Sequence, residues 1–235
     1  MLHKVEVIIV THETLHLVKK LYTGFRKVYP DAHVCILDNH STDGTVEWLN
    51  GLSEDKNLRT LLRAANMGHG PAMHEAIMSS SNQHEFALTI DSDCDVIAGG
   101  FIEAMLAKFD DDKVYATGWL RSVDRISGVS RDWFVTATPD AQFVPYVHPA
   151  FGMYKISIYK TLLPFFHHGA PCLDNMRVAS ERGYIVKEFP WSTYVTHLVG
   201  GTRRMYTGMG FGDWNPVQAP QAKRKPWDPT VKLPI

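Results

Sequence analysis

Apolar and polar positions along the first hundred residues follow a pattern that predicts strands alternating with helices. Residues 5–10 are mostly apolar and β-branched, which is typical of a parallel strand covered on both faces. Residues 14–28 carry apolar side chains at helical spacing, and Pro30 ends that helix. The alternation continues through predicted strands at 34–37, 58–62 and 86–90 and predicted helices at 45–52, 71–79 and 101–109. Repeated units of this kind predict a doubly wound α/β sheet with right-handed connections.

The second half of the chain is less regular. The pattern predicts a strand at 114–119, a loop or hairpin at 121–142, further elements at 151–163 and 173–182, and a strand at 184–189. From Gly200 onward glycine, proline and basic residues dominate, which predicts an irregular tail. Because the chain shows neither an internal repeat nor a clean linker, we expect a single domain.

Composition limits the class of protein. The chain has 235 residues, of which 45% are hydrophobic and 21% charged, as expected for a globular domain with a sizeable core. The net charge of −1 gives no general signature of polyanion binding. Three cysteines without CxxC spacing predict reduced thiols in a cytoplasmic protein. No apolar run approaches the roughly 20 residues that span a bilayer, so we expect no integral membrane segment.

Polar residues follow the predicted strands where each strand ends. Thr11, Asp38, Asn66 and Asp91 all lie at or just beyond such a carboxyl end. In doubly wound sheets, ligands bind at this edge. The sequence therefore predicts one site that these residues share.

Two motifs add chemistry to that edge. Asp91-Ser92-Asp93 places two carboxylates after a buried strand, and hard oxygen ligands suit Mg²⁺ or Mn²⁺, which also bind pyrophosphate oxygens. A simple turn explains the triplet equally well when it is taken alone. Residues 66–72 open a helix behind small residues, which favours a phosphate. Their spacing differs from that of dinucleotide-binding and P-loop motifs.

In this order along the chain, the motifs resemble those of the large family 2 of inverting GT-A glycosyltransferases, and most closely its rhamnosyltransferase-like members. The resemblance is carried by residues 7–13, 38–45, 66–77 and 91–93; it covers 4–100 well and 150–200 loosely. It implies a GT-A type, Rossmann-like, mixed doubly wound sheet and a UDP- or dTDP-type sugar donor with Mn²⁺ or Mg²⁺. It also implies a nucleotide-sugar-binding half at 1–100, an acceptor-binding half at 101–200 and a tail at 201–235.

The resemblance assigns donor-site roles residue by residue. The first matching segment holds the nucleotide base, although the family usually has an aromatic residue and Asn where this chain has His12 and Glu13. Asp91 matches the acid near the ribose and Asp93 the acid on the metal. The residues expected to bind the nucleotide sugar are Thr11, His12, Glu13, Asp38, Asn66, Gly68, Gly70, Asp91 and Ser92.

The catalytic base and a third metal ligand are expected in the second half. The family's Glu-Asp motif falls on Pro171 and Cys172, so we nominate Asp174, the only nearby carboxylate, as the base. The alternative is that Asp174 only caps a helix at 175–182. His197 follows the predicted strand 184–189 and is expected to join Asp91 and Asp93 as a metal ligand, although a structural role is an alternative.

These features predict a metal-dependent inverting glycosyltransferase whose acceptor is a glycan. DNA with a modified base is an alternative acceptor, because the second half carries basic residues, namely Arg121, Arg125, Arg131, Arg203, Arg204 and Lys223-Arg224-Lys225. A nucleotidyltransferase and a non-catalytic nucleotide-sugar-binding protein are alternatives of other classes. Four tryptophans are candidates for stacking on a sugar or base without an assigned role: Trp119, Trp133, Trp191 and Trp214.

Overall fold

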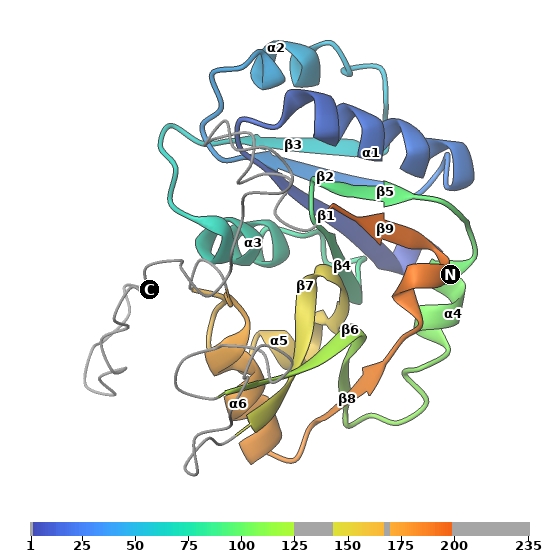
Figure 1. Cartoon of the computed structure of the whole chain (residues 1–235), viewed down its shortest axis with the longest axis vertical. Coiled ribbons are helices and arrows are strands. Elements are labelled where there is room, and N and C mark those ends of the chain that lie inside the picture. The colour runs from blue at the N-terminus through green and yellow to red at the C-terminus, as the bar shows by residue number, and fades with distance from the viewer. Residues whose placement is uncertain (1, 125–142, 167–169, 199–235) are drawn as a thin grey trace.

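The computed structural model of the chain describes residues 2–124, 143–166 and 170–198. A seven-stranded sheet has the order β3-β2-β1-β4-β7-β6-β8, and a separate two-stranded sheet pairs β5 with β9 (Figure 1). The strands are β1 (Val5–Thr11), β2 (His33–Asp38), β3 (Leu58–Leu62), β4 (Phe86–Ile90), β5 (Cys94–Val96), β6 (Val114–Asp124), β7 (Phe143–Lys155), β8 (Ile185–Glu188) and β9 (Val195–His197). The helices are η1 (Leu2–Lys4), α1 (Leu15–Val28), α2 (Thr45–Asn50), α3 (His69–Met78), α4 (Phe101–Leu106), α5 (Ile156–Tyr159), α6 (Leu173–Glu181) and η3 (Trp191–Thr193).

The sheet is mixed, as expected. β1 is parallel to β2 and β4, and β2 is parallel to β3. β7 runs antiparallel to β4 and β6, whereas β8 is parallel to β6. The four parallel strands therefore end at one edge, and the antiparallel strand β7 extends that edge toward the second half of the chain.

Alternate side chains of the parallel strands enter two separate cores. In β1, Val7 and Ile9 belong to the core that holds residues of α1 and α4, whereas Ile8 belongs to the core that holds residues of α3, α5 and α6. Figure 1 shows α1 and α3 on opposite faces of this half of the sheet. Burial on both faces explains why these strands read as continuous apolar runs.

Strands β6 and β7 form a longer hairpin than the sequence predicted. The segment 121–142, expected as a loop or hairpin, begins as strand, because β6 continues to Asp124. The element expected at 151–163 is instead the end of β7 followed by α5. Gly118 and Gly152 lie opposite each other, and a Cβ on Gly118 would lie only 2.3 Å from the Phe151 carbonyl oxygen. The sheet closes here only because neither residue has a side chain.

A glycine precedes both α2 and α3. The residue before α2 is Gly44, at φ 90°, and the helix begins at Thr45, as predicted. The residue before α3 is Gly68, at φ 89°, so the helix begins at His69 rather than at Pro71. Glycine adopts such left-handed conformations without the steric cost that other residues incur, so it can redirect the chain into a helix at once.

Two expectations from composition can be compared with the structure. Within the described ranges, no helix has both the length and the apolar character needed to cross a bilayer. All three cysteines are buried and none forms a disulfide, as predicted.

Candidate functional site

The acidic triplet lies between the end of β4 and the start of β5, and the β5–β9 pair brings His197 to it. In this pair His197 lies directly opposite Cys94. The His197 Nε2 atom is 3.2 Å from Asp93 Oδ1 and 3.9 Å from Asp91 Oδ2. The structure thus gathers the three predicted metal ligands, Asp91, Asp93 and His197, although His197 lies 104 positions after Asp93 in the sequence.

The environment of His197 resembles a cation site. Its side chain is only 9% exposed, and its Nδ1 atom has no hydrogen-bond partner among the described residues. Burial lowers the pKa of His197, but the hydrogen bond and charge of Asp93 and the charge of Asp91 outweigh burial, so the pKa is raised overall. Two carboxylates therefore attract positive charge at this position, which a proton or a metal ion can supply.

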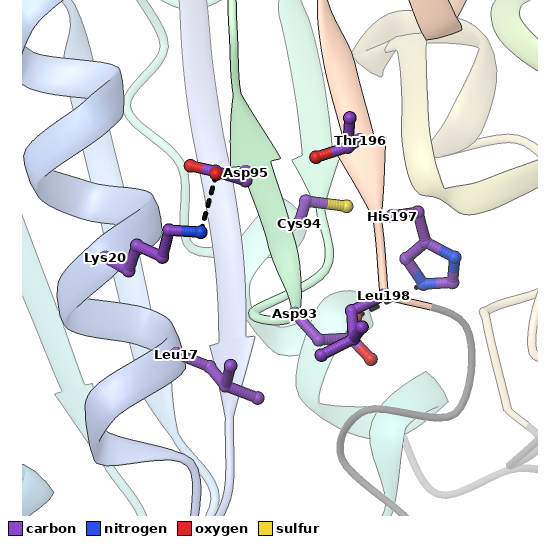
Figure 2. A pocket seen from close by; sticks show the side chains of 8 residues that line it. All are labelled: Leu17, Lys20, Asp93, Cys94, Asp95, Thr196, His197 and Leu198. Atoms are coloured by element: carbon purple, nitrogen blue, oxygen red, sulfur yellow. Dashed lines mark ion pairs between the residues drawn. The ribbon is translucent and has the colours of Figure 1, made fainter. Parts of the chain in front are cut away.

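Asp95, the third acid of this stretch, points elsewhere. Its carboxylate pairs with Lys20 of α1 at 2.7 Å, on the side of β5 away from His197 (Figure 2). A cavity of about 180 Å³ adjoins this region. Its lining residues are Leu17, Lys20, Asp93, Cys94, Asp95, Thr196, His197 and Leu198.

The start of α3 reaches the same acids. The His69 Nε2 atom is 3.4 Å from Asp91 Oδ1. The first turn of α3 therefore lies beside the acids, with Gly68 before it and the buried Gly70 within it. Free N–H groups at a helix start favour anions, so this turn suits a phosphate close to the acids. His69 lies within the glycine-rich motif of the sequence, but its type alone gave no reason to choose it.

Aromatic and basic residues line the other side of His197. The Trp119 ring stacks on Trp191, with centroids 4.4 Å apart, and meets the edge of His197 at 5.6 Å. His148 packs against Trp119 at 4.5 Å, and the Arg121 guanidinium lies over the same ring at 5.2 Å. Sequence reasoning missed His148, which no local motif marks. It left Trp119 and Trp191 without a role; Trp133 and Trp214 lie outside the described residues.

The loops after β1 and β4 are joined by buried hydroxyl groups. Thr11 Oγ1 is 2.7 Å from Thr14 Oγ1, which donates to Ser92 Oγ at 3.2 Å. All three residues are at most 6% exposed. Thr11 and Ser92, both predicted to contact the nucleotide sugar, thus hold the two loops together.

The loops after β1 and β2 are joined by Glu13. Its carboxylate accepts hydrogen bonds from the Thr42 amide at 2.6 Å and the Thr42 hydroxyl at 3.0 Å, and its own amide donates to Ser41 Oγ at 2.9 Å. Glu13 adopts a positive φ of 53°, which is uncommon for a residue with a side chain. His12, beside it, is partly exposed.

Asp38 and Asn66 complete the edge. Asp38 is 1% exposed; its Oδ2 atom accepts the Ser41 amide, but its buried Oδ1 atom has no hydrogen-bond partner among the described residues. Asn66 accepts from Asn39 at 2.7 Å and from the Gly68 amide at 2.9 Å, and thereby shapes the turn into α3. A buried carboxylate oxygen without a donor is costly, so a ligand that donates to Asp38 would stabilise it.

Asp174 lies in the first turn of α6 and does not cap that helix. The cap residue is Cys172, which makes no side-chain cap hydrogen bond, so the capping alternative is wrong. The Asp174 Oδ1 atom lies 3.8 Å from the Nε atom of Arg177, three residues along the helix. Burial raises the pKa of the Cys172 thiol, and the Asp91 carboxylate raises it further. The Asp91 carboxylate therefore acts electrostatically on the residue that precedes α6.

The sequence matches one family model over residues 6–163, and that model describes glycosyl transferase family 2. The chain belongs to this family. The matched segment includes the ends of all the strands that form the site except β9. It extends on both sides of the acids that follow β4. A comparison with curated protein sequences gave no significant match.

Solved structures of glycosyltransferases share the fold of this family 2 chain. A Pyrobaculum calidifontis mannosyltransferase in complex with GDP-Man and Mn²⁺ has a TM-score of 0.61 at 20% identity over 80% of this chain. S. aureus TarS in complex with UDP-GlcNAc has a TM-score of 0.56 at 16% identity over 82% of this chain. GalNAc-T7 with UDP, GalNAc and Mn²⁺ has a TM-score of 0.64 at 12% identity over 83% of this chain. The expected GT-A fold is thereby confirmed, whereas the closer likeness to rhamnosyltransferases stays a prediction.

This chain spans only part of those proteins. It covers 55% of the mannosyltransferase chain, 57% of the TarS chain and 43% of the GalNAc-T7 chain. The similarity therefore concerns the domain that carries the sheet.

Proposed function

We propose that the chain is a metal-dependent inverting glycosyltransferase that moves a sugar from a nucleoside diphosphate sugar to a hydroxyl group of a glycan. The observation that carries this proposal is the cluster of Asp91, Asp93 and His197 at the carboxyl end of β4, in a member of glycosyl transferase family 2. Two carboxylates and an imidazole suit Mn²⁺ or Mg²⁺, and the buried Asp93, with His197 Nε2 at 3.2 Å from its carboxylate, fits such an ion. When bound, a divalent ion neutralises charge on the departing diphosphate.

The donor lies along the strand ends in this proposal. Asp38 Oδ1 accepts a hydrogen bond from the base or ribose, since it is buried and otherwise lacks a donor among the described residues. The amides at the start of α3 face the phosphates, with Gly68 allowing close approach of the backbone. His12 and Glu13 lie on the base side; because Glu13 already bonds Thr42, it orders the loop that receives the base.

Asp174 serves as the base in this proposal. Its carboxylate takes the proton of the acceptor hydroxyl while that oxygen bonds to the anomeric carbon. The bond from the anomeric carbon to the diphosphate oxygen breaks on the opposite face, and its electron pair leaves with the diphosphate. The configuration at the anomeric carbon is therefore inverted. The position of Asp174 in the first turn of α6 supports this role.

A panel of nucleotide sugars tests the donor part of the proposal. Thermal unfolding is measured with UDP-, dTDP- and GDP-sugars, each with and without Mn²⁺. A donor at a hundred times its dissociation constant stabilises a protein by about 2.7 kcal/mol, or roughly 5–10 °C for a domain of this size. We expect one donor to do so only with Mn²⁺, and to lose the effect in Asp93→Asn. Asp95→Asn is the matched control, since Asp95 pairs with Lys20 instead.

The product then separates the possible reactions. Mass spectrometry distinguishes an added hexose from an added nucleoside monophosphate, which a nucleotidyltransferase would leave. If a donor binds but is not consumed with any acceptor tested, the result would favour a non-catalytic nucleotide-sugar-binding protein over a transferase. No stabilisation by any donor with Mn²⁺ would refute the donor site itself.

DNA remains the alternative acceptor. Of the basic residues that suggested it, only Arg121 lies in the described part of the chain, and it packs over Trp119. Arg125, Arg131, Arg203, Arg204 and Lys223-Arg224-Lys225 lie outside the described residues. Because tryptophan rings beside a donor site also suit the apolar faces of sugars, a glycan stays the proposed acceptor.

A further inference from the structure

A buried thiol lies within reach of the proposed metal ligands. Cys94 immediately follows Asp93, and the β5–β9 pairing places it directly across from His197. One ligand atom each from Asp93, Cys94 and His197 lies within 4.8 Å of the other two. Figure 2 shows the Cys94 sulfur directed toward β9, the strand that carries His197. Cross-strand neighbours in an antiparallel pair share one face of the sheet, so this approach is built into the fold.

These three side chains are held in place and shielded from solvent. Cys94 is 3% exposed, Asp93 is 8% exposed, and the His197 side chain is 9% exposed. The thiol makes one weak hydrogen bond, donating to the Ala150 carbonyl at 3.4 Å, and His197 Nδ1 has no partner among the described residues. A cavity of about 180 Å³ is lined by all three residues and gives an ion a route to them.

We propose that this cluster is a site for thiophilic divalent ions, Zn²⁺ above all, bound by the Asp93 carboxylate, the Cys94 thiolate and the His197 imidazole. Sulfur, nitrogen and oxygen ligands together suit Zn²⁺, which takes a tetrahedral set and leaves its fourth position to water or substrate. Mg²⁺ and Mn²⁺ prefer oxygen ligands and would leave the thiol protonated. As the sulfur–zinc bond forms, the thiol proton passes to solvent.

The geometry of the cluster favours binding of such an ion. A tetrahedral ion with bonds of about 2.0–2.3 Å holds its ligand atoms roughly 3.3–3.8 Å apart. The Asp93 Oδ1 and His197 Nε2 atoms already lie 3.2 Å apart, and ligand atoms of all three residues lie within 4.8 Å of one another. Small side-chain movements therefore bring the three to the spacing that a tetrahedral ion needs.

Zinc binding also has a consequence for transfer, which rests on the proposed function. Zn²⁺ and Mn²⁺ share Asp93 and His197, so they cannot both occupy the cluster. We expect Zn²⁺ to displace Mn²⁺ and to change donor binding, with the thiol determining the preference between the two ions.

Cobalt gives a direct readout of the thiol that does not depend on activity. Co²⁺, a stand-in for Zn²⁺, is titrated into the whole metal-free chain, and the near-ultraviolet charge-transfer band of a thiolate bound to Co²⁺ is recorded. The wild type and the Cys35→Ala variant should show the band, because Cys35 is a fully buried cysteine of β2 outside the cluster. Cys94→Ala should lack it. Added Zn²⁺ should abolish the band in the first two proteins.

Affinities complete the test. Zn²⁺ affinity is measured in competition with a chromophoric chelator, and we expect Cys94→Ala to weaken it at least tenfold. Loss of a residue that only hydrogen-bonds to a metal ligand already costs roughly tenfold or more, so loss of a direct ligand should cost at least as much. Mn²⁺ binding should weaken less than about threefold, because its hard ligands remain. If the wild type lacks the cobalt band, the proposal is overturned, whether or not Cys94→Ala folds. Equal Zn²⁺ affinity in the wild type and in Cys94→Ala overturns it as well. Failure of the donor panel with Mn²⁺ would instead refute the proposed function and leave the cobalt result standing.

Discussion

Protonation of His148 should destabilise the fold at mildly acidic pH. The His148 ring packs against Trp119, Tyr146 and His197 and accepts a hydrogen bond from the Ala150 amide through Nδ1 at 3.1 Å. Burial, followed by the charges of His197, Arg121 and His69, lowers its pKa to about 3. A proton on Nδ1 would also leave the Ala150 amide without its acceptor.

The size of the effect follows from linkage. A histidine whose pKa is depressed in the folded state contributes stability that is complete above its unfolded pKa and is lost as pH falls toward the folded value. With an unfolded pKa of 6.5 and a folded pKa of about 3, the loss at pH 5 is about 2 kcal/mol. Any folded pKa well below 5 gives nearly the same figure, because the folded ring is then uncharged at pH 5.

The perturbation is His148→Asn, which keeps an acceptor close to the Nδ1 position but does not titrate. Urea unfolding of metal-free protein, followed by tryptophan fluorescence, gives the free energy of unfolding at pH 7 and pH 5. The wild type should lose about 2 kcal/mol more than the variant between these pH values. His74 and His84, whose pKa values are also lowered by burial, contribute equally to both proteins and cancel. An identical pH dependence in the two proteins would refute the reasoning.

Three further substitutions test the packing by urea unfolding at pH 7. Gly24→Ala, inside α1, should stabilise the fold by about 0.8 kcal/mol, because the new Cβ makes only ordinary contacts at 3.7 Å or more and glycine is a poor helix former; a loss of stability would contradict this. Gly118→Ala should cost about 3 kcal/mol, since its Cβ meets fixed backbone, and a neutral result would show that β6 and β7 can separate. Arg59→Met should cost about 3–5 kcal/mol, because Glu6, which is 2% exposed and bound bidentately, would lose both guanidinium hydrogen bonds and keep only His84 at 4.0 Å. Adding Glu6→Leu should restore most of that loss, and a double variant as unstable as Arg59→Met would rule out the charge as its cause.

The first half of the fold could be predicted because each element carries its own signal. Strands β1, β2 and β4 are buried on both faces and therefore appear as apolar runs, and α1 shows its apolar face at helical spacing. The second half could not be predicted as well. The end of β6 carries the polar residues Arg121, Ser122 and Asp124, and the close approach of Gly118 to Gly152 depends on pairing between distant segments. Short-range patterns hold no information about such a pairing.

The candidate site divides in the same way. Thr11, Asp38 and Asp91 could be placed together because parallel strands bring their carboxyl ends to one edge. His69 and His148 were missed because the proximity of His69 to Asp91 and of His148 to His197 comes from how α3 and β7 pack, and neither histidine belongs to a spacing that indicates a ligand. The predicted tail at 201–235 lies outside the described residues, and the division of the chain into donor and acceptor halves stays a prediction.

The small β5–β9 sheet is the part of the structure that turns an acidic turn into a possible metal site. Without β9, Asp93 would be one of several carboxylates at a strand end, and an acidic turn binds no ion by itself. Three backbone pairings fix β9 against β5, and the Leu198 amide donates to the Asp93 carbonyl at 3.0 Å. These bonds hold His197 at the acids while Trp119 blocks its ring from the other side. The same pairing also brings Cys94 to His197. The β5–β9 sheet therefore completes a site for a hard ion and at the same time adds a soft thiol ligand to that site.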